Sequence, residues 1–78
     1  MSSAECEIRG YLKSRFPRYN DALTIEAPLD RVVDSLGLFD LVEWLEGRFA
    51  IRIPNEEFRP QRFNTIGSIV QTVREFKS

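Results

Sequence analysis

The sequence contains no histidine and only one cysteine, Cys6. Histidine is the commonest general base in enzymes and the commonest side-chain metal ligand, so its absence argues against the most frequent catalytic and metal-binding arrangements. A single cysteine cannot form an intramolecular disulfide, which fits a reducing compartment. We interpret Cys6 as a packed or incidental thiol. We therefore expect no catalytic residues and no metal site.

The sequence also lacks long apolar runs and a large excess of charge. No stretch approaches membrane-spanning length, and the N-terminal "MSSAECEIRGYLK" carries charges where a signal peptide needs an apolar core. The 11 basic and 12 acidic residues give a net charge of −1, without the basic excess of a nucleic-acid-binding protein. We expect a cytoplasmic monomer that binds neither nucleic acid nor membranes.

What is present is the composition of one small globular domain. Apolar residues make up 42% and charged residues 29% of the 78 positions, which is typical of a folded chain. A chain of this length has room for one domain, so we expect residues 1–78 to form it alone.

Two longer segments have the apolar spacing of helices. In "SSAECEIRGYLKSRF" apolar residues recur at steps of four, and Ser2 with Glu5 resembles a capping box at the helix start. Pro17 should end this helix. After a long loop over residues 17–33, an apolar stripe predicts a second helix from about Ser35 to Phe49.

The remaining segments predict one short and one longer helix. Pro54, followed by Glu56 and Glu57, should start a short helix that Pro60 limits to a turn or two. The last segment has an apolar face from Ile66 to Phe76, with Asn64 or Thr65 as its cap. The fold class is therefore all-α, a small antiparallel bundle of three main helices plus one short helix.

Ser35 is the candidate functional residue, because it stands beside Asp34 at the start of the best helix. A nucleophilic serine needs a base within reach, and here there is no histidine, no "SxxK" spacing and no glycine-flanked nucleophile elbow. Catalysis by Ser35 is therefore rejected. Serine is a favoured N-cap, so capping is one interpretation. The other is that Ser35 is a point of attachment.

The segment "DSLGLFDLVEWLEGRFAIRIPNEE" resembles the central segment of acyl carrier proteins. The matching residues follow one another without a gap from Asp34 to Glu57. They are Asp34-Ser35-Leu36, the acid Asp40, Leu45-Glu46, Phe49, and Ile53-Pro54 followed by acids. Downstream, "FNTIGSIVQTV" resembles the last helix of that family, so the resemblance covers nearly all of the chain.

The resemblance implies that Ser35 carries a covalent 4′-phosphopantetheine arm, flanked by Asp34 and Leu36. A separate phosphopantetheinyl transferase would add the arm from coenzyme A, and an acyl-loading ligase and downstream enzymes would use it. The protein would then hold acyl groups as thioesters for lipid, polyketide or other specialised acyl metabolism, without being an enzyme itself. A phosphodiester at this place would meet free N–H groups and the positive end of the helix dipole.

Partner recognition would rest on the second helix. Asp40, Glu43 and Glu46 give it an acidic side that can steer toward basic surfaces, and Phe39 would add an apolar anchor. An ordinary solvated face and a core phenylalanine are the structural alternatives for these residues.

Several residues depart from the family pattern and favour a specialised carrier over a general fatty-acid carrier. Gly37 replaces a common acid and should loosen the helix start, and Trp44 is bulky where a small residue is usual. Two other functions remain open, an aminoacyl carrier and a helical interaction module that never takes the arm. A peptidyl carrier is disfavoured because the glycine pair usual before the serine is missing.

Overall fold

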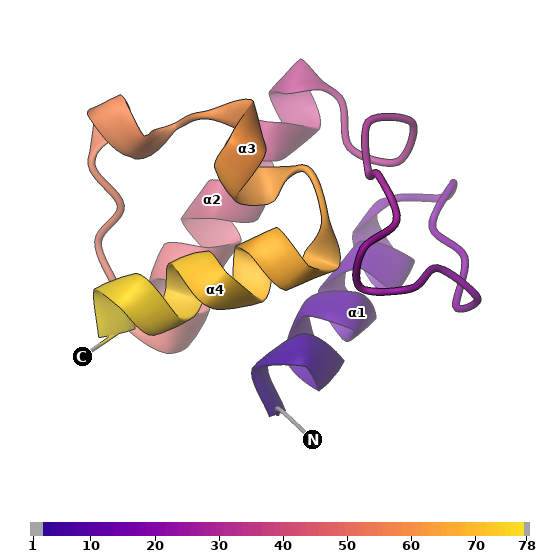
Figure 1. Cartoon of the computed structure of the whole chain (residues 1–78), viewed down its shortest axis with the longest axis horizontal. Coiled ribbons are helices and arrows are strands. Elements are labelled where there is room, and N and C mark those ends of the chain that lie inside the picture. The colour runs from indigo at the N-terminus through magenta and orange to yellow at the C-terminus, as the bar shows by residue number, and fades with distance from the viewer. Residues whose placement is uncertain (1–2, 78) are drawn as a thin grey trace.

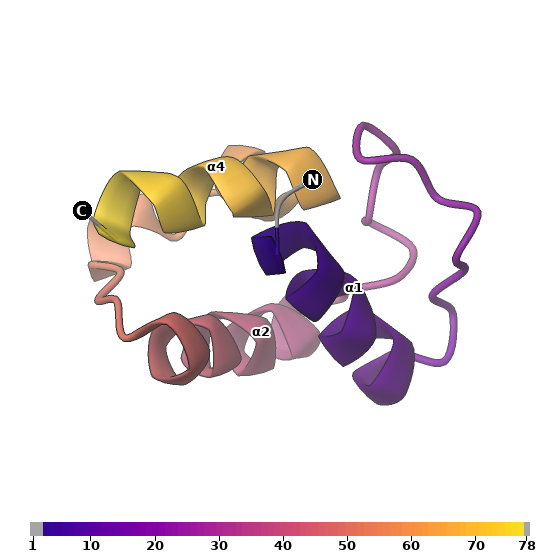
Figure 2. The same cartoon turned by 90° about the horizontal axis from the view of Figure 1, so that it is seen from below.

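Three longer helices account for the architecture of residues 3–77, the part of the chain that this computed structural model describes. Figure 1 shows α4 crossing in front of α2, and the turned view in Figure 2 separates these two helices into layers with α1 alongside. Residues 3–77 contain no strand, which confirms the predicted all-α class. The elements in chain order are α1 (Ser3–Arg15), α2 (Ser35–Phe49), the 3₁₀ helix η1 (Asn55–Glu57), α3 (Pro60–Phe63) and α4 (Ile66–Lys77).

The core is a single apolar cluster to which every longer helix contributes. Six of its members have no exposed surface, namely Ile8, Leu12, Leu41, Leu45, Ile66 and Ile69. Burial of each such side chain contributes about 1.5–3 kcal/mol, which is the main stabilising term in a chain this short. Trp44 and Tyr11 pack against this cluster from one side.

The loop between α1 and α2 is fixed to the other end of the chain by backbone hydrogen bonds. The Gly67 N–H donates to the Ile25 carbonyl and the Leu29 N–H donates to the Asn64 carbonyl, each over 2.8 Å. Leu29 itself is buried, with 1% of its surface exposed. The long loop therefore approaches α2 along a defined path, held against the start of α4.

Side-chain contacts between residues 7–16 and α2 form a seam that runs along α2 from Gly37 to Arg48. The contacting residues are spaced by three or four positions on α2, so they share one face of that helix. The pairs are Phe16 with Gly37, Arg15 with Asp40, Tyr11 with Trp44, and Glu7 with Arg48. The Tyr11 and Trp44 rings stack with centroids 4.4 Å apart. The seam covers one side of α2 and leaves another side to solvent.

The predicted elements agree with the structure for α2, whose observed bounds are the expected ones, and for the cap of α4, and differ in detail elsewhere. Ser2 of the predicted capping box lies outside the described residues. The short helix that Pro60 was predicted to limit is η1, which ends at Glu57 before Pro60. Pro60 itself begins α3, a further short helix that the sequence did not predict, as the fixed φ of proline favours at a helix start. Thr65 is the cap of α4, because its Oγ1 accepts the Ser68 N–H over 2.9 Å. Gly37, which was expected to loosen the start of α2, is buried under Phe16.

Candidate functional site

The candidate site lies where the loop enters α2. Asp34 has an extended backbone, with φ −87° and ψ −176°, and its Oδ1 accepts the Gly37 N–H over 2.7 Å. The Leu38 N–H donates to the Asp34 carbonyl over 2.8 Å, which closes the first turn. Asp34 is therefore the N-cap, and Ser35 is the first helical residue.

The position of Asp34 bears on whether Ser35 is a helix cap or a point of attachment. Ser35 does not cap the helix, because the neighbouring carboxylate does. Its side chain is exposed. The N–H groups of Ser35 and Leu36 belong to the first turn, where no intrahelical acceptor exists. An anionic group attached at Ser35 would thus meet unpaired donors and the positive end of the α2 dipole.

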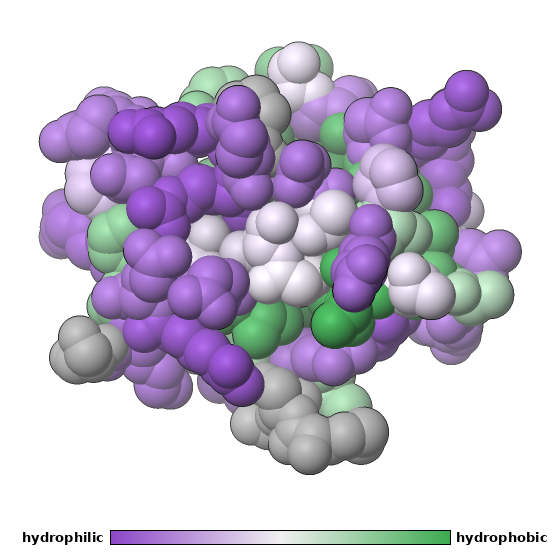
Figure 3. Space-filling model, viewed as in Figure 1, coloured by the Kyte–Doolittle hydropathy of each residue, from purple (hydrophilic) through white to green (hydrophobic). Residues whose placement is uncertain are grey.

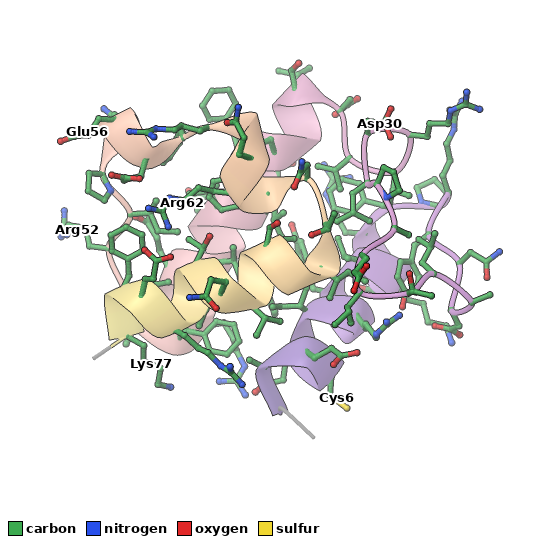
Figure 4. The ribbon with its side chains drawn as sticks, in the orientation of Figure 1. Cys6, Asp30, Arg52, Glu56, Arg62 and Lys77 are labelled. Carbon is green, nitrogen blue, oxygen red and sulfur yellow. The ribbon has the colours of Figure 1, made fainter. Side chains whose placement is uncertain are left out.

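A groove of about 440 Å³ adjoins Ser35 on the side of α3. Its walls come from the loop, the first turn of α2 and the end of α3, and four of its lining residues are apolar: Leu29, Val33, Leu38 and Phe63. Asp30 stands at its edge, on the loop beside the start of α2 (Figure 4). An arm attached at Ser35 would therefore have an apolar surface next to it.

The exposed side of α2 next to Ser35 is mainly apolar. Leu36 has 78% and Phe39 has 59% of its surface exposed, which is unusual for large apolar side chains. The Phe39 ring has Phe58 as its neighbour, with centroids 6.0 Å apart. Glu43 is exposed one turn further along. These residues form a strip that begins beside Ser35 and faces solvent.

Two of the three acids predicted to meet partners make contacts within the chain. The Asp40 carboxylate forms an ion pair with Arg15, and their hydrogen bond raises the pKa of Arg15 above its ordinary value. Glu46 Oε2 accepts the Ile53 N–H over 2.8 Å and so organises the segment after α2. Glu43 is the predicted acid for which no such contact is seen among residues 3–77. Arg15 therefore offsets the charge of Asp40, whereas Glu46 keeps its negative charge and is held by the backbone.

Other polar clusters lie away from Ser35. Arg62 sits between α3 and α4 (Figure 4), where it forms ion pairs with Glu57 over 2.8 Å and Glu75 over 2.9 Å. This α3 and α4 side of the molecule is largely hydrophilic (Figure 3). Cys6 is exposed on α1, so its thiol is not packed in the core. Among residues 3–77 no cluster of three potential metal ligands is found, and no helix is long and apolar enough to span a membrane.

Comparison with known proteins defines the class. The family model described as "Phosphopantetheine attachment site" matches residues 7–73, which is most of the chain. The chain therefore belongs to the acyl carrier protein family, whose members carry 4′-phosphopantetheine covalently and are carriers rather than catalysts. This confirms the predicted resemblance, and 4′-phosphopantetheine is the cofactor of this chain.

Within that class, the chain is similar to D-alanyl carrier proteins. It is 40% identical over 47 residues to the D-alanyl carrier protein of Streptococcus uberis and 43% identical over 47 residues to that of Streptococcus sanguinis, with 60% of each chain covered. The protein from Streptococcus pyogenes serotype M5 is 44% identical over 46 residues, covering 59% of this chain and 58% of the relative. The match thus spans about 60% of the length of these curated relatives.

The residues at the start of α2 fit the cofactor. An exposed hydroxyl, two unpaired N–H groups and an adjacent apolar groove match a phosphodiester followed by an extended chain. The sequence missed one contributor, Phe16, which packs against Gly37. Two features of the sequence could have indicated this contact. Phe16 is an aromatic residue directly before Pro17, where α1 ends, and Gly37 is a glycine in the first turn of the next helix.

We expect the cap hydrogen bond, rather than the charge of Asp34, to hold the first turn. Asp34→Ala should lower the free energy of unfolding by about 1 kcal/mol, because the Gly37 N–H loses its acceptor. Asp34→Asn keeps an amide oxygen at the same place and should cost much less. Urea denaturation at constant salt measures both. Equal losses in the two variants would contradict this account.

Proposed function

We propose that Ser35 is the attachment residue and that this protein presents a small, aminoacyl-type group on its arm. The observation that carries the proposal is the exposed Ser35 side chain at the first helical position, directly after the Asp34 cap. On a separate transferase, the Ser35 Oγ would lose its proton and attack the pantetheine-bound phosphorus of coenzyme A. The pyrophosphate bond would break, leaving the arm as a phosphodiester on Ser35 and releasing adenosine 3′,5′-bisphosphate. The arm's terminal thiol supplies the thioester chemistry. The residues of the chain anchor the arm and are recognised by partners.

The aminoacyl character is supported by two independent observations. The similar proteins from streptococci are named for D-alanyl cargo, so D-alanine is the candidate that they suggest. The interior of this chain is also filled by large side chains, since Trp44 stacks on Tyr11 and meets Phe49 edge-on with centroids 5.9 Å apart. A long acyl chain would have to displace such contacts, whereas a small polar cargo need not enter the bundle.

Lipid or polyketide carriage is the second candidate for the cargo, and the groove of about 440 Å³ beside Ser35 is the observation in its favour. Its apolar walls could cover part of an acyl chain. Its floor, however, is formed by Leu29 and Phe63, which are 1% and 3% exposed and belong to the packed core. We therefore favour the smaller cargo.

We propose that partner proteins bind mainly to the apolar strip beside Ser35, and less to the acidic residues of α2. Leu36 and Phe39 are exposed and would be covered by a partner, while Glu43 would add one charge at the end of the strip. Asp40 and Glu46 would contribute less, since Arg15 and the Ile53 N–H already engage them. Buried aromatic anchors usually dominate interface energies, whereas exposed charges mainly affect association rates.

The attachment residue is tested by intact-mass measurement after incubation with coenzyme A and a broad-specificity phosphopantetheinyl transferase. We expect the mass of one phosphopantetheine to be added to the natural chain and none to Ser35→Ala. Ser14→Ala is the matched control, because Ser14 is also exposed and helical, and it should be modified normally. If a known carrier is modified while this chain is not, the protein is an unmodified interaction module instead.

The cargo is tested by the melting temperature of arm-loaded forms. Octanoyl- and D-alanyl-phosphopantetheine can both be attached from the corresponding coenzyme A thioesters. We expect neither to shift the melting temperature, relative to the unloaded arm, by more than about 2 °C. A buried octanoyl chain would contribute about 5 kcal/mol of apolar burial and raise the melting temperature by more than about 10 °C, and that result would favour acyl carriage.

The role of the apolar strip in partner binding is tested by measuring kcat/KM for arm transfer with the same transferase. Phe39→Ala should lower kcat/KM for arm transfer about fivefold or more, because an exposed aromatic anchor is lost, with little change in the free energy of unfolding. Asp40→Asn should have the smaller effect on kcat/KM. The opposite ranking, with Asp40→Asn the more damaging, would restore the acidic-helix interpretation.

A further inference from the structure

Phe16, which directly follows α1, packs closely against Gly37 in the first turn of α2. A Cβ atom placed on Gly37 would lie 2.5 Å from Phe16 Cε1 and 3.1 Å from Phe16 Cζ, distances that real Cβ atoms avoid. The ring therefore occupies the space in which any other residue would place its side chain. Glycine at position 37 is required by packing and not by backbone conformation, because its φ is not positive.

The Phe16 ring is held in place from several directions. It is 6% exposed, and the Phe16 N–H donates to the Leu12 carbonyl over 2.9 Å, which continues the geometry of α1. The Tyr11 ring meets it edge-on with centroids 6.0 Å apart, and the Arg15 guanidinium lies 5.2 Å from its centroid. These contacts hold the ring in place directly after α1, so the first turn of α2 has to accommodate it.

The same glycine also touches the cap. The Cβ that Gly37 lacks would lie 3.0 Å from Asp34 Oδ1, the atom that accepts the Gly37 N–H. The ring of Phe16 and the cap carboxylate therefore approach Gly37 together. A side chain at position 37 would thus press on the ring and on the cap carboxylate at once, in the turn that contains Ser35.

The other glycine of α2 provides the contrast. A Cβ on Gly47 would meet nothing within 4 Å, so that position has no packing requirement for glycine. Glycine is unfavourable inside helices, and Gly37 is kept there in direct contact with α1. Of the two glycines of α2, Gly37 is therefore the one whose position excludes a larger side chain.

From these contacts we infer that Phe16 is a positioning residue for arm attachment: through Gly37 it fixes the first turn of α2 so that the Ser35 Oγ is presented to the transferase. This inference rests on the proposed role of Ser35. Phe16 acts through Gly37 and Asp34 and does not itself need to touch the transferase. Misplacement of a reacting group by about 1 Å can reduce a rate about 100-fold.

The test introduces a clash with Phe16 by placing a methyl group at position 37, and then removes the clash with a second substitution. Gly37→Ala should reduce kcat/KM for arm transfer about tenfold or more at a temperature where the variant remains folded, with kcat falling more than KM rises. Phe16→Leu shortens the opposing side chain, so the double variant Phe16→Leu/Gly37→Ala should recover most of that loss. Gly47→Ala is the matched control, because it adds the same methyl group to the same helix in open space, and it should transfer at the natural rate.

A purely structural role would give a different pattern. The double variant removes ring contacts in the core, so it should melt below the natural chain and yet transfer faster than Gly37→Ala. If arm transfer instead followed melting temperature across the four proteins, or if Gly37→Ala transferred at the natural rate, the inference would be overturned.

Amide hydrogen exchange tests the positioning role of Phe16 independently of arm attachment at Ser35. In the unmodified protein, the residue-37 amide should exchange faster in Gly37→Ala and regain protection in the double variant, whether or not an arm can be attached. Restored protection with no arm transfer to any variant would contradict the role of Ser35 and leave the positioning contact standing. Unchanged protection in Gly37→Ala would contradict the positioning contact.

Discussion

The hydrogen bond from the Gly37 amide to the Asp34 carboxylate is the interaction on which the candidate site depends. It decides that α2 begins at Ser35 rather than one residue earlier or later. If Ser35 were the cap, its hydroxyl would be turned back to the helix and engaged by a backbone N–H. Because Asp34 takes that place, the Ser35 side chain is left exposed. The exposure of the Ser35 hydroxyl thus depends on the neighbouring Asp34, which caps the helix in its place.

Elements far apart in the chain support this short turn. Phe16 holds it from α1, and the Leu29 hydrogen bond to Asn64 anchors the incoming loop to the junction of α3 and α4. The core beneath is made of fully buried aliphatic residues from α1, α2 and α4. The rest of the bundle therefore holds the turn that contains Ser35 in a defined position. This arrangement suits a carrier protein, whose cargo is attached and processed by other proteins.

The sequence could predict α2 well because its apolar stripe has a clear helical period and its start carries two strong capping residues. It could not decide which of Asp34 and Ser35 caps the helix, because both residue types cap well, and the outcome depends on contacts with α1. It also assigned Asp40 and Glu46 to a free acidic face. Their actual partners, Arg15 and the Ile53 N–H, lie on other segments, and such pairings are not encoded in the period of one helix. Trp44, read as a departure from the family, is explained by its stacking on Tyr11.

The most direct test of the central claim is tandem mass spectrometry of the chain after arm transfer, with fragmentation that locates the added mass. The account predicts that fragments containing Ser35 carry the whole increment and that fragments covering the other serines carry none. An increment located on any other residue, with Ser35 unmodified, would contradict it.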